Sequence, residues 1–523
     1  MESAAHQSYF HMFLAMEQQI LSFPVLLSFL LFIFMVLKVW KKNKDNPNSP
    51  PGPRKLPIIG NMHQLAGSDL PHHPVTELSK TYGPIMSIQL GQISAIVISS
   101  VEGAKEVLKT QGELFAERPL LLAAEAVLYN RMDIIFGAYG DHWRQLRKLC
   151  TLEVLSAKRI QSFSSLRQEE LSHFVRFVHS KAGSPINLSK VLFALTNSII
   201  ARIATGKKCK NQDALLDLIE DVIEVSGGFS IADLFPSLKF IHVITGMKSR
   251  LEKLHRITDQ VLEDIVNEHK ATRAASKNGG GDDDKKEAKN LLDVLLDLQE
   301  DGSLLQVPLT DDSIKAAILE MLGGGSDTSA KTTEWAMSEM MRYPETMKKA
   351  QEEVRQAFGN AGKIDEARIH ELKYLRAVFK ETLRLHPPLA MIPRECRQKT
   401  KINGYDIYPK TKTLINVYAI GRDPNVWSEP EKFYPERHLD SPIDFRGSNF
   451  ELIPFGAGKR ICPGMTLAIT TVELFLAHLL YYFDWKFVDG MTADTLDMTE
   501  SFGASIKRKI DLALVPIPVS PLP

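Results

Sequence analysis

One thiol near the C-terminus lies in a setting that could give it chemistry. Cys462 belongs to the stretch 454–464, which reads Pro-Phe-Gly-Ala-Gly-Lys-Arg-Ile-Cys-Pro-Gly. Glycines on both sides of a cysteine allow positive φ angles and a close approach of the backbone to a flat partner. The apolar run from Met465 to Phe483 predicts a buried helix, whose positive N-terminal end would lower the pKa of the thiol. Taken alone, the pattern also fits a small buried apolar cysteine.

A second set of residues interrupts a long predicted helix. Thr310 can cap a helix that would run to about Arg342. Its middle holds three glycines at 323–325, each of which costs roughly 1 kcal/mol relative to alanine in a helix interior. Thr328 could bond back to the carbonyl of Gly324 and open the helix locally. The alternative is a flexible, glycine-weakened helix with a satisfied threonine.

Two further pairs of residues lie one helical turn apart. Trp143 and Arg147 share a face of one predicted helix, and Glu381 and Arg384 share a face of another that ends before Pro387. Each pair alone has an ordinary interpretation, an arginine lying on a half-buried tryptophan or a solvated ion pair. A functional interpretation therefore depends on the rest of the chain.

The elements that carry these residues are mostly helices. Apolar periodicity predicts further helices over residues 101–110, 140–151, 167–180, 188–204, 251–275 and 370–385. A β-hairpin is predicted over 85–98 and another at Asn403-Gly404, followed by an apolar strand over 414–420. Residues 278–289, with three glycines and three aspartates, predict a solvated loop.

The composition excludes several classes of protein. Lys plus Arg and Asp plus Glu are 63 each in 523 residues, and nothing in this balance favours a nucleic-acid partner. The four cysteines are far apart in the sequence and form no C-x-x-C motif, so they indicate neither a disulfide framework nor a zinc site.

The N-terminus differs from this balanced composition. Residues 20–37 form an uncharged apolar run of roughly 18 residues, about enough to cross the hydrocarbon core of a bilayer. Lysines follow the run, whereas the segment before it carries Glu2 and Glu17 and no Lys or Arg, so the positive-inside rule places the main body in the cytosol. A cleaved signal peptide is the alternative, but the basic residues lie on the wrong side for it. We expect an N-terminal extension and membrane anchor at 1–45, a proline-rich hinge at 46–60 and one large domain at 61–523.

The cysteine loop resembles that of the cytochrome P-450 superfamily. The family pattern F-x-x-G-x-R-x-C-x-G is filled here by Phe455, Gly458, Arg460, Cys462 and Gly464. Residues 324–329 fit the family's (A/G)-G-x-(D/E)-T-(T/S), and residues 435–438 resemble P-E-R-F with histidine in the last place. With the anchor, hinge, W-x-x-x-R and E-x-x-R, the motifs follow the family's order over essentially the whole chain. The resemblance implies a mainly α fold with small β-sheets, the cytochrome P-450 fold, and one N-terminal transmembrane helix.

The resemblance also implies roles for individual residues. Cys462 becomes the thiolate ligand of haem iron, and the cofactor-binding set is Trp143, Arg147, Arg394, Phe455, Arg460 and Cys462. Asp327 and Thr328 become the catalytic residues that deliver protons to dioxygen, while Glu381, Arg384 and Arg437 become a buried structural network. The implied substrate pocket comprises Leu128, Phe136, Leu319, Gly323, Gly324, Ala390, Met391, Ile392, Phe502 and Ala504.

Three short segments are similar to the plant 71-type group of the family, namely residues 393–395, 443–447 and 482–485. Within this group the chain resembles terpenoid oxidases, particularly those that act on casbene-type macrocyclic diterpenes. The implied reaction is mono-oxygenation with haem b, O2 and NADPH-derived electrons delivered by a separate cytochrome P-450 reductase. The implied location is the endoplasmic reticulum membrane, single-pass, with a cytosolic catalytic domain. Its partners would be the bilayer, the reductase and a small lipophilic substrate, with no nucleic acid.

Other functions remain as alternatives. The substrate could instead be a phenylpropanoid or an alkaloid. A haem-thiolate isomerase or dehydratase would use the same ligand without consuming O2, but Thr328 argues against it because that chemistry needs no proton relay to oxygen. A non-catalytic haem protein would explain Cys462 but neither the 324–329 motif nor the anchor.

Overall fold

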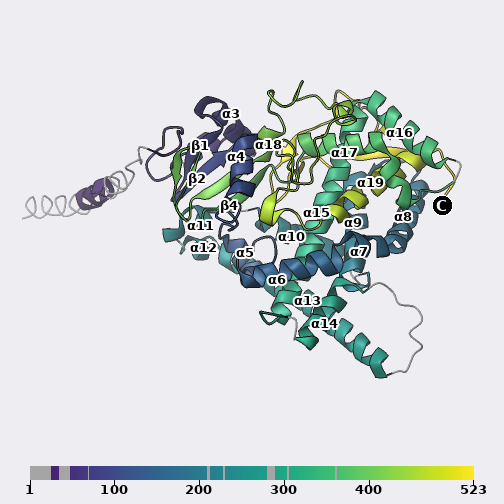
Figure 1. Cartoon of the computed structure of the whole chain (residues 1–523), viewed down its shortest axis with the longest axis horizontal. Helices are drawn as coiled ribbons and strands as arrows, with labels where there is room; N and C mark the ends of the chain where they lie inside the picture. Colours follow the sequence, from purple (N-terminus) through teal and green to yellow (C-terminus); the bar gives the residue numbers. More distant parts are fainter. Residues whose placement is uncertain are drawn as a thin grey trace, which may run out of the picture.

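The computed structural model describes residues 25–34, 48–68, 70–208, 212–227, 230–238, 240–278, 289–302, 305–359 and 362–522. A small sheet-containing part and a larger helical part lie side by side (Figure 1). The first contains β1 (Ile85–Leu90), β2 (Ile93–Ile98) and β4 (Met391–Glu395) with α3 (His72–Tyr82) and α4 (Val101–Lys105). The expected mainly α fold with small β-sheets is confirmed.

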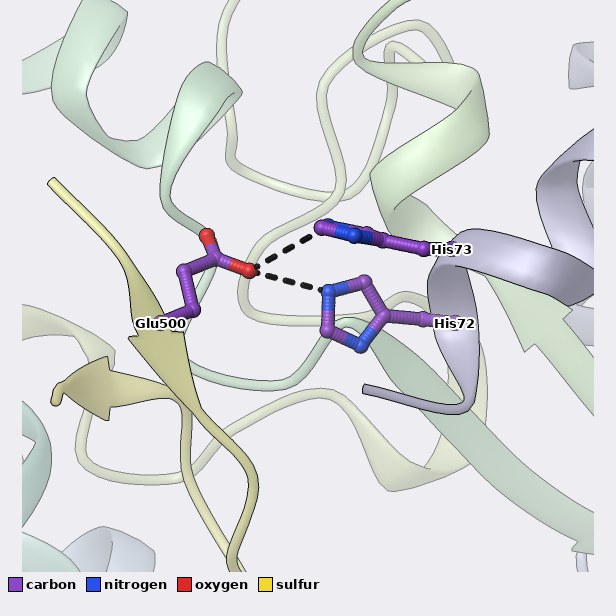
Figure 2. Close-up of side chains that lie close together, drawn as sticks. All are labelled: His72, His73 and Glu500. Carbon is purple, nitrogen blue, oxygen red and sulfur yellow. Dashed lines mark hydrogen bonds and ion pairs between the residues drawn. The ribbon is translucent and has the colours of Figure 1, made fainter. Parts of the chain in front are cut away.

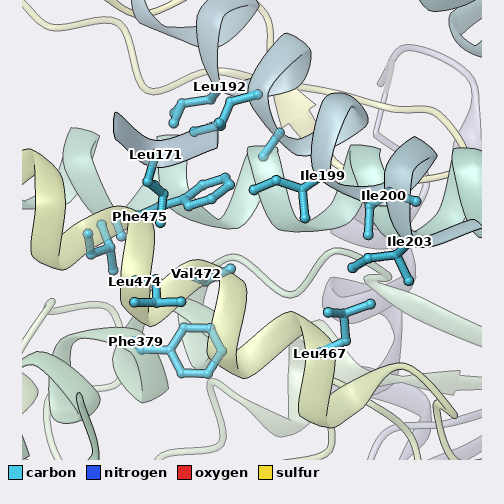
Figure 3. Close-up of a cluster of buried hydrophobic side chains, with 14 of the residues drawn as sticks. Leu171, Leu192, Ile199, Ile200, Ile203, Phe379, Leu467, Val472, Leu474 and Phe475 are labelled. Atoms are coloured by element: carbon cyan, nitrogen blue, oxygen red, sulfur yellow. The ribbon is translucent and has the colours of Figure 1, made fainter. Parts of the chain in front are cut away.

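Four helices form the centre of the helical part: α9 (Leu188–Thr205), α15 (Asp311–Arg342), α17 (Lys373–Leu385) and α19 (Met465–Tyr482). Their apolar side chains belong to one buried cluster, and Figure 3 shows Ile199 and Ile200 of α9 on one side and Val472 and Phe475 of α19 on the other. Each fully buried large apolar side chain contributes about 1.5–3 kcal/mol. Helix α17 begins later than the predicted residue 370, because a 3₁₀ turn (Glu366–Glu371) precedes it.

Helix α15 begins and ends as the sequence predicts. The Thr310 hydroxyl accepts a hydrogen bond from the Ser313 N–H, and Asp311 and Asp312 lie in the first turn. Both features stabilise the positive end of the helix. The helix continues without a break through the three glycines, because burial against α9 holds it in place.

The main sheet has the strand order β1-β2-β7-β4, where β7 spans Lys412–Asn416. β1 and β2 pair antiparallel around Gly91, which has φ of 58°, so the first predicted hairpin is confirmed. The second forms between β5 (Thr400–Ile402) and β6 (Tyr405–Ile407). The strand predicted over 414–420 is wrong beyond residue 416. The side chain of Asn416 accepts from the Ala419 N–H and starts a short helix there, α18 (Val417–Ile420).

The remaining elements surround this centre. The structure contains the predicted helix 101–110 as α4 with a π-helical turn (Glu106–Thr110), and the predicted helix 140–151 as α6 (Asp141–Leu149) with a π-helical turn (Cys150–Val154). The predicted helix 167–180 corresponds to α8 (Ser164–Ser180), and the predicted helix 251–275 corresponds to α13 (Met247–Asn278). The other helices are α2 (Met62–Leu65), α5 (Leu122–Val127), α7 (Ala157–Ser162), α10 (Gln212–Val225), α11 (Ile231–Leu234), α12 (Ile241–Ile244), α14 (Leu291–Asp301) and α16 (Pro344–Phe358). The short 3₁₀ turns are Tyr129–Arg131, Pro236–Leu238, Pro435–His438 and Gly458–Arg460. The other strands are β3 (Ile186–Asn187), β8 (Phe483–Phe487), β9 (Glu500–Ser501), β10 (Lys507–Arg508) and β11 (Ala513–Pro518).

A short apolar helix, Val25–Phe34, lies within the predicted anchor, and all of its side chains are exposed. The rest of the apolar run and residues 279–288 of the predicted loop lie outside the described residues. Two described helices, α9 and α19, are long and apolar enough to cross a membrane, but both are mostly buried inside the protein. These two are therefore core helices, and Val25–Phe34 is the better candidate for membrane contact.

Candidate functional site

A single cavity brings together the cysteine loop, the glycine-rich part of α15 and four arginines. From the cysteine loop and the start of α19, its lining includes Pro454, Phe455, Gly456, Arg460, Cys462, Pro463, Gly464, Leu467 and Ala468. The α15 residues include Ala317, Glu320, Met321, Gly324, Gly325, Thr328, Ser329 and Thr332. Apolar residues such as Ile134, Ile135, Ile200, Leu389 and Ile392 complete the wall. A second hollow, at the surface beside α8 and the start of α19, is lined by polar and apolar residues and contains no thiol.

The cysteine loop is held in place by its own backbone. The Cys462 N–H donates to the carbonyl of Phe455 at 2.9 Å. Gly458 has φ of 69°, and a Cβ there would lie 1.9 Å from the carbonyl oxygen of Leu108, so only glycine fits. The side chain of Arg147 reaches the loop and donates to the carbonyl of Ile461. These contacts place the thiol at the cavity wall, next to the start of α19.

The protein groups around Cys462 act on its pKa in opposite directions. Burial raises the pKa of this thiol, whereas the Gly464 N–H and the charge of Arg147 lower it. Burial has the larger effect, so the pKa of the thiol is raised overall, although the N–H at the start of α19 lowers it in the predicted direction. A buried thiol of this kind needs a strong positive partner, such as a metal ion, to ionise.

A second thiol, Cys150, also lines the cavity. Sequence reasoning missed it because no motif marks it. It lies in the π-helical turn that follows α6, and burial raises its pKa to about 12. Cys462 differs from it by lying in a glycine loop with a backbone N–H directed at the sulfur. Cys462 is therefore the better ligand.

Four arginines line the cavity: Arg118, Arg147, Arg394 and Arg460. Burial lowers the pKa of Arg394 far below its usual range, and the positive charges of the other three lower it further. Burial also lowers the pKa of Arg118 to about 10 and that of Arg460 to about 9. Buried charges of one sign are costly unless an anion compensates them.

This arginine cluster is the observation that fits haem. The sequence predicts three of its members as haem contacts, and Arg118 is the one that it missed. Among the described residues, the Arg394 guanidinium donates only to the carbonyl of Pro393, at 3.0 Å. An uncompensated guanidinium beside a thiol suits a ligand with a metal centre and two carboxylates, because guanidinium binds carboxylate through charge-assisted hydrogen bonds.

Two of the predicted haem contacts have other partners in this arrangement. Arg460 donates to the backbone carbonyls of Ala116 at 2.5 Å and Gly137 at 2.6 Å. The Trp143 indole donates its N–H to the carbonyl of Ile134 at 2.9 Å, and its ring lies 4.2 Å from the Arg460 guanidinium. Trp143 is not among the residues that line the cavity, so its contact with a haem carboxylate stays a prediction.

The face opposite the thiol comes from α15. The Thr328 hydroxyl donates to the carbonyl of Gly324 at 2.8 Å, as predicted, yet the helix stays continuous. A Cβ on Gly325 would lie 3.1 Å from Ile200 of α9, so this glycine permits close helix packing. The nearest atom to a Cβ on Gly324 would be Ile135 at 3.5 Å, and Gly324 borders the cavity. Thr328 and Gly324 thus line the cavity that also contains Cys462, and their part in binding oxygen stays a prediction.

Asp327 lies beside the cavity rather than in its wall. Its carboxylate pairs with the Lys331 ammonium at 2.5 Å and accepts a hydrogen bond from the Ser505 hydroxyl. Lys331 also donates to the Ser505 oxygen at 2.7 Å. Sequence reasoning missed Lys331 as a partner, although its position one turn after Asp327 was the available signal. The three groups form a connected polar cluster.

A buried carboxyl group in the cavity was also missed. Glu320 accepts a hydrogen bond from the Ile134 N–H at 2.7 Å and lines the cavity. Burial and the nearby Asp133 raise its pKa well above the usual range. No motif marks this residue, and only the packing of α15 against residues 133–135 places it here.

The predicted substrate pocket is only partly gathered at this cavity. Gly324 and Ile392 line it. The other residues of that prediction are not among the lining residues: Leu128, Phe136, Leu319, Gly323, Ala390, Met391, Phe502 and Ala504. Leu128, Leu319 and Ala390 are buried among other side chains. A part in substrate binding for these eight stays a prediction.

The predicted structural residues lie together away from the cavity. Glu381 receives two 2.8 Å hydrogen bonds from Arg384 and one of 3.0 Å from Arg437. The Nε2 atom of His438 lies 2.9 Å from the same carboxylate. Burial alone would raise the pKa of Glu381, but hydrogen bonds from Arg384 and His438 lower it to about 2. The histidine that replaces the family's usual phenylalanine is therefore a further partner of this carboxylate.

Comparison with known proteins agrees with this geometry. Residues 50–512 match the protein family described as cytochrome P-450. The chain is 63% identical to cytochrome P-450 726A27 of Euphorbia lathyris, over 96% of this chain and 99% of that protein. It is 49% identical to premnaspirodiene oxygenase of Hyoscyamus muticus, over 96% and 99% of the two chains, and 49% identical to melianol synthase of Citrus sinensis, over 94% and 96%. A solved zebra fish cytochrome P-450 with abiraterone is 25% identical, with a TM-score of 0.72 over 86% of this chain and 100% of that chain.

Proposed function

Since this chain belongs to the cytochrome P-450 family, we propose that it inserts one oxygen atom from O2 into a lipophilic terpenoid, with casbene-type macrocyclic diterpenes as the first candidates. The family uses haem with a cysteine thiolate ligand, O2 and NADPH-derived electrons, and its members are mono-oxygenases. The observation that carries the proposal is one cavity lined by Cys462, by four arginines, two of them buried, and by residues of the Gly324–Thr328 segment.

The residues that would hold the haem are those on the thiol side. Cys462 would ligate the iron, and Phe455 packs edge to face on Phe445 behind the loop at 5.5 Å. Arg394, with Arg147 and Arg118 beside it, would compensate the haem carboxylates. When bound, thiolate-ligated haem supplies the oxidant, because electron density from the thiolate favours O–O cleavage.

The residues of α15 would deliver protons. The Lys331 ammonium lies 2.5 Å from the Asp327 carboxylate and 2.7 Å from the Ser505 hydroxyl oxygen. Thr328 is the residue that directly follows Asp327 in α15. Thr328 lines the cavity, and its hydroxyl would be able to exchange its hydrogen bond to Gly324 for one to dioxygen or to water. We assign Thr328 as the last donor to oxygen and Asp327 as the group that passes protons to it.

The substrate class follows from the wall and the relatives. Part of the cavity wall is formed by apolar side chains, including those of Ile135, Ile200, Met321 and Leu389. A wall of this kind binds hydrocarbon-like molecules. Premnaspirodiene oxygenase and melianol synthase, each 49% identical to this chain, act on terpenoids, and this similarity supports a terpenoid as the substrate.

We further propose that the chain is a single-pass protein of the endoplasmic reticulum membrane with its catalytic domain in the cytosol. The exposed apolar helix Val25–Phe34 and the lysines after residue 37 support this orientation. NADPH-cytochrome P-450 reductase would supply the electrons, because the sequence contains no convincing dinucleotide-binding motif.

The experiment that tests the substrate is turnover in microsomes that contain the full chain and a reductase. A panel of terpenes, including casbene, is supplied with NADPH under ¹⁸O2 and compared with phenolic and alkaloid panels by mass spectrometry. The expected result is a terpene product carrying one ¹⁸O atom. Oxidation of only phenolic or alkaloid compounds would overturn the terpenoid proposal and keep the reaction class. Products without ¹⁸O would overturn mono-oxygenation.

A further inference from the structure

Three side chains from opposite ends of the chain converge outside the cavity: His72 and His73 at the start of α3, and Glu500 in β9 (Figure 2). The Nε2 atom of His72 lies 3.0 Å from Oε2 of Glu500, and the Nε2 atom of His73 lies 3.5 Å from the same oxygen. All three potential ligand atoms lie within 4.8 Å of one another. Two imidazole nitrogens and a carboxylate oxygen therefore face one point.

The spacing of these atoms suits a small divalent ion. Zinc binds imidazole nitrogen and carboxylate oxygen at about 2.0–2.2 Å in a tetrahedron, which sets its ligand atoms about 3.3 Å apart. The distances of 3.0 and 3.5 Å to Glu500 lie on either side of this value. Small side-chain rotations would therefore be enough to admit an ion.

Unpartnered nitrogens point into the cluster. The Nε2 atom of His73 and the Nδ1 atom of His386 are buried and have no hydrogen-bond partner in the described part of the chain. The His386 side chain is only 9% exposed, and its Nδ1 atom lies 3.6 Å from Oε1 of Glu500. A buried polar atom without a hydrogen bond lowers stability. Both nitrogens face the Glu500 carboxylate at ion-pair distance, 3.5 and 3.6 Å, without forming a good hydrogen bond to it.

The surroundings hold the carboxylate in place. Nε2 of His386 lies 2.7 Å from Oε1 of Glu339, and its ring stacks on Trp335 with a centroid distance of 4.0 Å. His386 is thereby fixed against the second oxygen of Glu500. Outer partners of this kind orient metal ligands and raise metal affinity. The ion-pair partners of Glu500 among the described residues are all histidines, and Arg422, whose positive charge acts on His72, pairs with Glu431 instead.

A second group of possible ligands lacks these features. Glu169, Glu170 and His173 also lie close together on α8. There Glu170 pairs with Arg202 at 2.5 Å and with Lys208 at 2.8 Å, and Glu169 pairs with Arg202 at 2.9 Å. The two carboxylates are already compensated, so this group serves as a control rather than as a site.

We propose that His72, His73 and Glu500 bind one divalent transition-metal ion, with zinc as the first candidate. Neutral imidazole and carboxylate are ligands that zinc accepts, and a water molecule would be the fourth ligand of the tetrahedron. The ion would tie α3 to β9, which leads to Ser505 beside Asp327. This proposal does not depend on the substrate of the enzyme.

The test counts zinc in the purified full-length holoenzyme. The protein is treated with a chelator, dialysed against buffered micromolar zinc, and analysed for zinc per haem iron. The wild type is expected to bind one zinc per haem. His73→Ala, at a partly exposed position, is expected to weaken zinc binding about tenfold or more, because it removes a direct ligand. His370→Ala, an exposed histidine outside both groups, and His173→Ala are the matched controls and are expected to bind zinc as the wild type does.

Zinc K-edge absorption provides a second measurement on the wild type and is expected to show two imidazole ligands. Glu500→Gln should also weaken zinc binding. If Glu500→Gln does not fold, His73→Ala still tests the proposal. Folding of each variant is checked by its haem content. The proposal is overturned if the wild type binds no zinc, if His73→Ala binds it as tightly as the wild type, or if binding is lost in His173→Ala instead.

Discussion

Two groups of buried charges in this protein differ in how they are compensated. Around Glu381, every charge has a partner: Arg384 at 2.8 Å, Arg437 at 3.0 Å and His438 at 2.9 Å. In the cavity, Arg394 lies near other arginines, and its pKa is lowered by burial and by their charges. In the first group the protein itself supplies the charged partners. In the second group Arg394 still needs an anion as its partner. The difference separates a structural network from a binding site without reference to any motif.

The largest expected effect is at the compensated network. Glu381→Ala leaves Arg384 and Arg437 buried without a counter-charge and should lower the free energy of unfolding by about 3–5 kcal/mol. The matched control is Glu371→Ala, which breaks an exposed pair with Arg368 at the same spacing, also 2.8 Å long. An exposed pair of this kind contributes little to stability, because water screens it. Denaturant unfolding measures both variants, and equal losses would show that burial does not distinguish the two pairs.

Acid should weaken the same network. The folded pKa of Glu381 is about 2, below the ordinary value of 4.5. A depressed carboxyl pKa adds stability above the unfolded pKa, and this stability is lost as pH falls from about 4.5 towards 2. The stability difference between wild type and Glu381→Gln should therefore shrink over that window, by up to about 3 kcal/mol. A difference that stays constant from pH 6 to pH 3 would mean that Glu381 is not held ionised by its partners.

Removing a charge from the arginine cluster of the cavity should not destabilise the protein, in contrast to removing Glu381. Arg394→Leu removes one of several like charges, so the haem-free protein should keep its stability or gain some. Haem should be retained about tenfold less well, because a charge-assisted contact of about 1.5 kcal/mol is lost. Arg437→Leu is the matched change at a paired arginine and should lower the stability of the haem-free protein. If Arg394→Leu lowers that stability as much as Arg437→Leu does, the contrast between the two groups is wrong.

A smaller structural effect is expected at the oxygen side. Thr328→Ala should keep the fold and the haem but divert electrons from product to peroxide, because the donor to oxygen is lost. Thr333→Ala is the control, since its hydroxyl makes the same kind of bond, to Ser329 O at 2.9 Å, without lining the cavity. The peroxide formed per NADPH consumed measures the difference. Equal coupling in the two variants would remove Thr328 from the proton relay.

The sequence predicts those parts of the fold and site that depend on neighbouring residues. The cap at Thr310, the hairpin at Gly91 and the bond from Thr328 to Gly324 are all local, and all are present in the structure. The predicted strand 414–420 was wrong for a local reason as well, because the capping side chain of Asn416 was overlooked.

The remaining features depend on packing between distant segments. Arg118 reaches the carbonyl of Pro393, and Ser505 reaches Asp327, across long stretches of chain that no local pattern connects. The same holds for His72 and Glu500. A zinc motif can be found in a sequence only when its ligands lie near one another in the chain, and His72 and Glu500 lie near opposite ends of it.

The central claim is that Cys462 is the iron ligand, and the second thiol in the cavity provides its sharpest test. The measurement is the absorption of the carbon monoxide complex of the reduced protein for wild type, Cys462→Ser and Cys150→Ser, since both cysteines line the cavity. The thiolate-ligated absorption should be lost in Cys462→Ser and kept in Cys150→Ser. Persistence of that absorption in Cys462→Ser, or its loss in a folded Cys150→Ser protein, would contradict the claim.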